Sequence, residues 1–141
     1  MKKEVIISVI GSREGEAPSV VTSRGDYFIK DGMHYLFFEE QDEESRSIIK
    51  NRIRMNECQV EIKKSGAVAS HMIFQIGNRH AFMYQTPYGD IRMVIDTKMI
   101  KLRETEKEIE MQLSYHIFSE EEMVSDNKVQ IKIIEKSSMN E

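Results

Sequence analysis

Apolar and polar residues alternate one by one over long stretches of this chain. The pattern is clearest at residues 67–76 and again at 90–99. A side-chain period of two is typical of a β-strand that buries one face. The same alternation runs from Ile109 to Ile117. It outweighs the helix-forming residues at 101–110, so we predict strands on both sides of a charged turn there.

Glycine, proline and aspartate separate these alternating stretches. Asp31-Gly32 between two apolar runs is a strong signal for a two-residue hairpin. We also expect a turn at Arg24-Gly25-Asp26 and a tight turn at Thr86–Gly89. The predicted strands cover about residues 3–11, 19–24, 27–30, 33–38, 47–55, 58–64, 67–76, 79–86, 90–102, 107–118 and 127–135.

The turn at Thr86–Gly89 leaves two registers open. In a plain two-residue turn, Tyr84 faces Ile91 and Phe82 faces Met93. If Gly89 forms a left-handed bulge, the register moves by one residue and Met83, instead of Tyr84 and Phe82, lies on the same side as Ile91 and Met93. A slip of one residue exchanges the two faces of a strand, so this choice decides which side chains face inward.

About ten short strands with no long helix predict an all-β protein, and the long strands favour a single antiparallel, meandering β-barrel. The length of 141 residues fits one domain, which we place at residues 1–136. Residues 137–141 are predicted to be a flexible C-terminal tail.

Several short motifs are similar to those of a known family. They are Tyr27–Lys30 before a tight turn, Lys64–Val68, Met72-x-Phe74 and Tyr84-x-Thr86-Pro87-Tyr88-Gly89 before an alternating strand. In order and spacing they resemble the YwiB-like family, a bacterial family of unknown function found mainly in Gram-positive organisms. The resemblance implies a small lipocalin-like, calycin-type β-barrel. It carries over no catalytic residue.

Composition describes an ordinary globular protein without a strong electrostatic preference. Hydrophobic residues make up 40% and charged residues 31%, and the net charge is −4. The apolar run near the N-terminus is short and lacks a cleavage site, and no run reaches membrane-spanning length. Cys58 is the single cysteine, and we expect it to be a small buried hydrophobic residue. We therefore expect a cytoplasmic protein.

Candidate chemistry is sparse. His34, His71, His80 and His116 lack the spacing of common zinc motifs, and the acidic run at 39–44 lacks the spacing of a calcium loop. No nucleophile, phosphate-loop or dinucleotide motif is present in the sequence. We therefore expect no metal, no cofactor and no enzymatic activity.

A barrel interior offers one candidate site, because a barrel of this size either fills with its own side chains or holds one small ligand. Hydroxyl groups interrupt its predicted apolar face and could orient a ligand or bond to one another. The predicted lining residues are Ser70, Met72, Phe74, Tyr84, Met93, Thr97 and Tyr115.

A basic strand offers a second candidate. Lys50, Arg52 and Arg54 alternate with uncharged residues, so their side chains should share one face. Beside exposed aromatic residues such a face could bind single-stranded nucleic acid. The other interpretation is an ordinary solvated surface, which the acidic net charge favours.

The first hairpin predicts a homodimer. Both of its faces are apolar, although a barrel strand needs only one apolar face. Something should cover the outer face, either the chain's own N-terminal strand or acidic loop, or a second copy. For the second copy, we place the interface at Tyr27, Ile29, Leu36 and Phe38.

These observations favour a non-enzymatic cytoplasmic barrel that binds a small apolar or amphipathic ligand or a partner protein. The alternative is a nucleic-acid or regulatory binding module that uses the basic strand. An enzyme without a recognisable motif ranks third.

Overall fold

A computed structural model describes residues 2–135 as ten β-strands without a helix. None of these residues forms a helix that is long and apolar enough to cross a membrane. The strands are β1 (Lys3–Arg13), β2 (Ser19–Lys30), β3 (Met33–Gln41), β4 (Ile48–Met55), β5 (Gln59–Gly66), β6 (Ser70–Gln75), β7 (Arg79–Thr86), β8 (Gly89–Glu104), β9 (Glu108–Ser119) and β10 (Glu122–Glu135). The predicted C-terminal tail lies outside the described residues.

All ten strands belong to one antiparallel sheet in the order β6-β5-β4-β3-β2-β1-β10-β9-β8-β7. Each strand pairs with the next one in sequence, except at β6 and β7. The ladder between β1 and β10 runs from Val5↔Glu135 to Arg13↔Asn127 and winds the sheet into a barrel. The predicted meandering, lipocalin-like barrel is confirmed.

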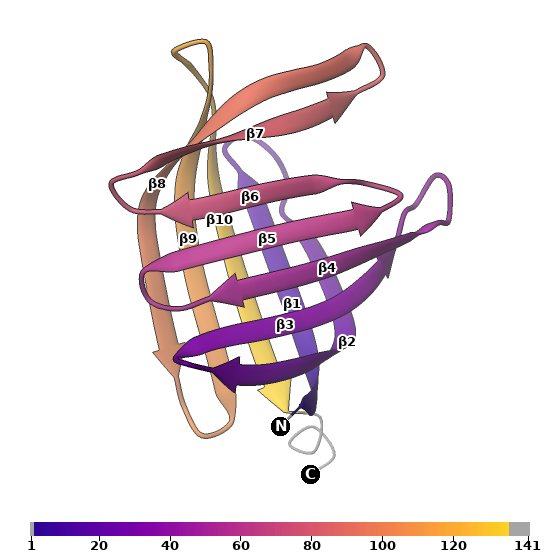
Figure 1. Ribbon diagram of the computed structural model, residues 1–141, viewed down its shortest axis with the longest axis vertical. Coiled ribbons are helices and arrows are strands. Elements are labelled where there is room, and N and C mark those ends of the chain that lie inside the picture. The colour runs from indigo at the N-terminus through magenta and orange to yellow at the C-terminus, as the bar shows by residue number, and fades with distance from the viewer. Residues whose placement is uncertain (1, 136–141) are drawn as a thin grey trace.

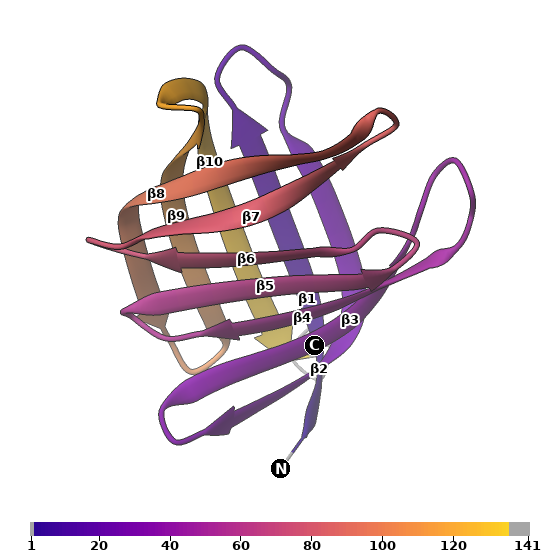
Figure 2. The same cartoon turned by 45° about the horizontal axis from the view of Figure 1, so that its top comes forward.

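The barrel consists of two layers whose strands cross steeply. In Figure 1, β3–β6 run across the front while β8, β9, β10 and β1 run steeply behind them. Figure 2, tilted toward the viewer, shows the hairpin of β7 and β8 next to β6 at the front. The 16-residue strand β8 passes from one layer to the other and contains an irregular register between Thr97 and Met99.

Inward-facing apolar side chains from both layers form one core. Leu36, Ile53 and Phe74 from the front layer and Ile95 and Met111 from the back layer are at most 1% exposed. Along β3 and β4, residues that face the barrel interior alternate with residues that face outward, and the interior set supplies Leu36, Phe38, Ile53 and Met55 to this core.

The predicted turns at Asp31-Gly32 and at Thr86–Gly89 are confirmed. Asp31 and Gly32 have φ angles of 53° and 77°, as a type I′ hairpin turn requires. At the second turn the register is the plain one, with Tyr84 opposite Ile91. Gly89 has a φ of 118°, a region that favours glycine, but the register does not shift.

The predicted turn at Arg24-Gly25-Asp26 is wrong, because β2 continues through it. A Cβ on Gly25 would lie 2.5 Å from the carbonyl oxygen of Phe37 and 2.6 Å from Cδ1 of Ile7. Gly25 therefore allows β2 to pass close to β3 and β1 without leaving the sheet.

The predicted dimer surface is also wrong in part. Leu36 is fully buried and Phe38 is 7% exposed, because both face the barrel interior. Tyr27 is half-buried against the same core, whereas Ile29 is 54% exposed near the hairpin turn. The outer face of the hairpin belongs instead to residues of the opposite parity.

We predict that Gly25→Ala destabilises the protein by about 2–3 kcal/mol, because the added methyl group meets backbone that cannot move aside. Gly11→Ala is a matched control in a neighbouring strand, where the nearest atom is the flexible Oγ of Ser19 at 3.3 Å. It should change stability by about 0.5 kcal/mol at most. Urea denaturation of both variants measures the difference, and equal midpoints would contradict the close approach at Gly25.

Candidate functional site

Three of the predicted interior residues, Phe74, Thr97 and Tyr115, are buried. The rings of Phe74 and Tyr115 meet edge to face with centroids 4.7 Å apart. Oγ1 of Thr97 accepts a hydrogen bond of 3.1 Å from the backbone N–H of Gln75, and burial raises the pKa of Tyr115 to about 12. The ring contact and the hydrogen bond of Thr97 to the backbone favour a filled interior.

The other predicted lining residues lie toward the margins of the core. Ser70, Met72 and Met93 are half-buried, and Met72 and Met93 pack against the core. Tyr84 is 51% exposed, because the hairpin of β7 and β8 extends beyond the other strands.

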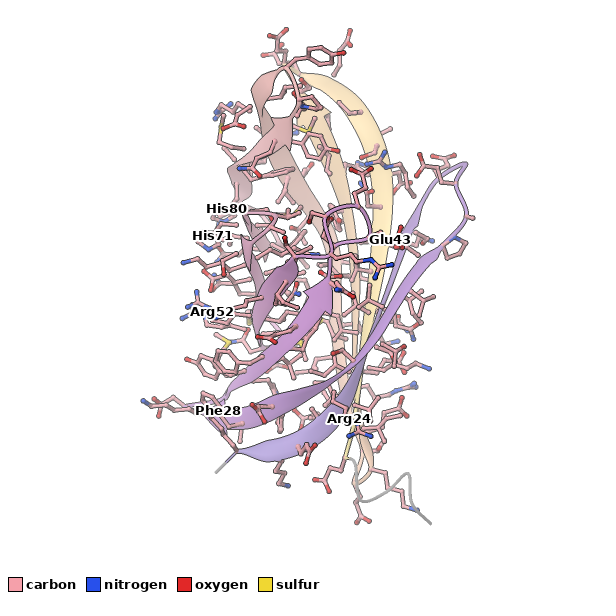
Figure 3. The ribbon with its side chains drawn as sticks, turned by 90° about the vertical axis from the view of Figure 1, so that its right-hand side faces the viewer. Arg24, Phe28, Glu43, Arg52, His71 and His80 are labelled. Carbon is pink, nitrogen blue, oxygen red and sulfur yellow. The ribbon has the colours of Figure 1, made fainter. Side chains whose placement is uncertain are left out.

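The outer face of β2–β6 carries a different set of side chains. Lys50, Arg52 and Arg54 lie together on this face, whereas Asn51 and Ile53 between them are buried. Figure 3 shows Phe28, Arg52 and His71 one above another along the same side of the barrel. We call this surface the outer face.

Three aromatic rings form a stack on the outer face. The centroids of Phe28 and Tyr35 lie 4.7 Å apart, and those of Phe28 and Phe37 lie 5.8 Å apart, with nearly parallel planes. Each ring is half-buried. The guanidinium of Arg54 lies 6.0 Å from the centre of the Tyr35 ring, and Arg52 is the register partner of Phe37. The aromatic rings of β2 and β3 therefore lie directly beside the cations of β4.

Next to the aromatic stack, one carboxylate gathers three basic side chains. Oε1 of Glu61 lies 3.1 Å from Nε of Arg54 and 3.3 Å from a terminal nitrogen of Arg52, and Nε2 of His71 donates to Oε2 at 2.8 Å. We call this group the Glu61 cluster. Glu61 is 8% exposed although it faces outward, because its partners cover it.

The electrostatics of Glu61 follow from this arrangement. Burial alone would raise the pKa of its carboxyl group. The hydrogen bond from His71 and the positive charges of Arg54 and Arg52 outweigh burial, so the pKa is lowered from 4.5. Glu61 is therefore ionised at neutral pH and holds both guanidinium groups over the sheet.

The outer face is more basic than the whole chain. On β2–β5 its six cations outnumber its three carboxylates. The cations are Arg24, Lys30, Lys50, Arg52, Arg54 and Lys63, and the carboxylates are Asp26, Glu39 and Glu61. A shallow depression of about 440 Å³ lies on this face among Arg24, Phe37 and Lys50. The net charge of −4 therefore arises from other surfaces.

The four histidines have separate partners. Nδ1 of His34 lies 2.7 Å from the hydroxyl of Tyr27 and its Nε2 lies 2.7 Å from Glu104, inside one end of the barrel. His80 contacts Gln75, and His116 contacts Asp126. Within residues 2–135, no three His, Cys, Asp or Glu side chains gather in a way that could hold a metal ion.

Cys58 is exposed in the turn between β4 and β5, so its predicted burial is wrong.

Comparison with known proteins identifies the family. Residues 5–131 match the model named "Domain of unknown function (DUF1934)". The chain belongs to this family. The crystal structure of the ywiB protein from Bacillus subtilis is similar, with a TM-score of 0.77 and 19% sequence identity over 95% of this chain and 92% of that one. This likeness supports the YwiB-like assignment and the fold. No curated protein matches the sequence.

Sequence reasoning found the basic strand but missed the aromatic stack and the Glu61 cluster. Phe28, Tyr35 and Phe37 were visible as one face of the first hairpin, but the opposite face is equally apolar. Glu61 meets its partners across β4, β5 and β6, and only the strand register brings these residues together. The available signal in the sequence was Glu61, a single carboxylate in the strand that follows the basic strand of Arg52 and Arg54.

We predict that Glu61→Gln lowers the free energy of unfolding by about 1.5–3 kcal/mol at pH 7, because hydrogen bonds to an ionised group are lost. Folding lowers the pKa of Glu61, so its contribution is present above 4.5 and disappears as the pH falls through the lower folded value. The parent and the variant should therefore converge in acid. Urea denaturation between neutral and acid pH measures this.

The matched control is Glu39→Gln on the same face. Glu39 is exposed and forms no ion pair with the described residues. This substitution should change stability by about 0.5 kcal/mol at most at every pH. A Glu61→Gln deficit that stays constant into acid would show that packing rather than charge is responsible.

Proposed function

We propose that this protein is a non-enzymatic, cytoplasmic module that binds single-stranded nucleic acid on the outer face. The observation that carries the proposal is the stack of Phe28, Tyr35 and Phe37 flanked by Arg52 and Arg54. Proteins that bind single strands without sequence preference combine such aromatic rings with a positively charged surface.

Each part of the outer face has a role in this proposal. Nucleobases stack on the partly exposed rings, and phosphates contact Arg52, Arg54 and Lys50 along β4. Stacking and charge lie on neighbouring strands about 5 Å apart. Bases and backbone phosphates of one strand could therefore be engaged together.

Glu61 has two opposing effects on binding. It holds Arg52 and Arg54 in place before a ligand arrives. It also competes with phosphate for the same guanidinium groups, and its own charge repels the backbone. Removing the charge of Glu61 should therefore strengthen binding, even though it weakens the fold.

The small-ligand function expected from the sequence has less support. It requires an open interior, but the rings of Phe74 and Tyr115 pack against each other and the hydroxyl of Thr97 bonds to the backbone. The homodimer stays a prediction. The surface available for it is the outer face of Phe28, Tyr35 and Phe37 rather than Leu36 and Phe38.

We predict that the parent binds fluorescent oligo(U) and oligo(dT), measured by anisotropy. About three phosphate contacts give a slope of log affinity against log salt of about −2. In the double variant Arg52→Gln, Arg54→Gln the slope should fall to about −0.7. Tyr35→Ala should weaken binding about tenfold or more without changing the slope, since a stacked base contributes about 1–3 kcal/mol. Glu61→Gln should bind more tightly than the parent.

The control variant is Lys101→Gln, Lys128→Gln, which removes two exposed lysines from β8 and β10 on the other layer. It should bind like the parent. Equal losses in the control and in the arginine variant would show non-specific attraction and overturn the site. Sedimentation equilibrium that gives a dimer, with Tyr35→Ala monomeric and no oligonucleotide bound, would assign the outer face to a second copy.

A further inference from the structure

The neighbouring strands β6 and β7 are not joined by a ladder. They form the two ends of the sheet order, although they are consecutive in sequence and lie side by side in Figures 1 and 2. Among residues 2–135, the backbone hydrogen bond that links them is at their turn, from the N–H of Asn78 to the carbonyl of Gln75 at 3.2 Å. We call the unpaired stretch beyond this turn the seam.

Two hydrogen bonds from backbone N–H groups to side chains lie at the two ends of the seam. The N–H of Gln75 donates to Oγ1 of Thr97 on β8 at 3.1 Å, and Oε1 of Gln85 accepts a long hydrogen bond of 3.5 Å from the N–H of Ala69. A side chain that bridges two strands requires more space between them than a ladder does. The seam is thus closed at the turn and held apart toward Ala69 and Gln85.

The strand registers show which backbone groups face the seam. The N–H of Asn56 bonds to the carbonyl of Gln59, so Gln59 points toward β4 and the alternate residues of β5 point toward β6. In an antiparallel ladder this alternation leaves His71 and Ile73 pointing away from β5, into the seam. The two-residue turn between Thr86 and Gly89 sets the direction of the backbone groups of β7 in the same way. Thr86 points toward β8, and Ala81 and Met83 therefore face the seam.

The two walls of the seam differ in chemistry. A depression of about 470 Å³ opens on it, with Lys63 and His71 on one side, Ala81 and Met83 on the other, and the nearly buried Phe82 between them. Exposed apolar side chains gather on the β7–β8 hairpin; Met83, Tyr84 and Ile91 are 44–51% exposed.

Cations flank the seam on both sides, and one carboxylate, Asp90, also lines the depression. Lys63 lies one strand beyond His71, and Arg92 is the register partner of Met83. Neither forms an ion pair with another of the described residues. An occupant with carboxylates on its outward side would therefore complement this surface, and apolar side chains on its inward side would meet Phe82 and Tyr84.

We propose that the seam binds an extended segment of a partner protein in which apolar and acidic residues alternate. The segment adds to β6 as a strand and hydrogen-bonds to His71 and Ile73. Its apolar side chains point toward Phe82, and its acidic side chains lie between Lys63 and Arg92. A peptide fits better than a nucleic acid here, because only a peptide backbone supplies donors and acceptors at the spacing of a strand edge. The proposal is independent of nucleic-acid binding on the outer face.

The test is amide hydrogen exchange followed by NMR on the whole chain. In the free protein, the amides of His71, Ile73, Ala81 and Met83 should exchange faster than those of Met72 and Phe82, which point into ladders. A capped peptide of alternating valine and glutamate should slow exchange at His71 and Ile73 about tenfold or more. A matched peptide of alternating valine and lysine should not. The glutamate peptide with N-methyl groups along one edge should lose the effect, since it lacks the donors that face β6.

Two protein variants distinguish charge complementarity at the seam from non-specific binding of the peptide. Lys63→Glu should weaken binding of the glutamate peptide about threefold or more, whereas Lys101→Glu on the other layer should leave it unchanged. Two outcomes would overturn the proposal. One is slow exchange of the seam amides in the free protein at every protein concentration. The other is that the valine–lysine peptide or the N-methylated peptide protects these amides as strongly as the glutamate peptide does.

Protection that rises with protein concentration in the absence of peptide would overturn the proposal in favour of a second copy. If the parent protein does not bind the oligonucleotides but the glutamate peptide still slows exchange at His71 and Ile73, the proposed function is overturned and the proposal for the seam stands.

Discussion

Burial of the inner side of one continuous sheet is the constraint on which the structure depends. The two layers hold together because side chains such as Phe74 in front and Tyr115 behind meet in the middle. With a side-chain period of two, every residue placed inside sends its neighbours outside. The alternation that buries Leu36 and Phe38 therefore presents Tyr35 and Phe37 to the surface. Barrel packing does not require aromatic residues at these outer positions, which makes them informative about binding.

Winding the sheet does not by itself remove its edges. The β1–β10 ladder closes one side of the barrel, but β6 and β7 retain edge groups that a fully closed barrel would satisfy. An exposed edge invites pairing with other chains, and proteins commonly limit this by keeping edge strands short and charged. With six residues and Lys63 one strand away, β6 fits this description. A short edge strand of this kind limits unintended pairing with other chains.

The sequence was sufficient for features that depend on local pattern. Alternation located the strands, including residues 108–119 with their helix-forming start, and Asp31-Gly32 and Thr86–Gly89 located two turns. The sequence was insufficient where the same local pattern fits two different structures. Gly25 reads as a turn residue, but in the fold it marks a close approach to Phe37, which lies on a different strand.

The candidate sites likewise divide into features that one strand determines and features that depend on how several strands pack. The alternation of Lys50, Arg52 and Arg54 was readable, since their common face follows from one strand alone. Which side of the first hairpin faces outward was not readable, because both sides are apolar and only core packing distinguishes them. The Glu61 cluster and the seam depend on registers among several strands, and no single segment encodes them.

The pairing of the first strand with the last has a consequence for synthesis on the ribosome. β10 emerges after the other nine strands, so β1 has only β2 beside it while the rest of the chain is made. During that time the growing sheet of β1–β6 carries an apolar side that later strands must cover. Exposed apolar surface of this kind is prone to aggregation until the later strands cover it. Completion of the barrel has to wait until β10 is available.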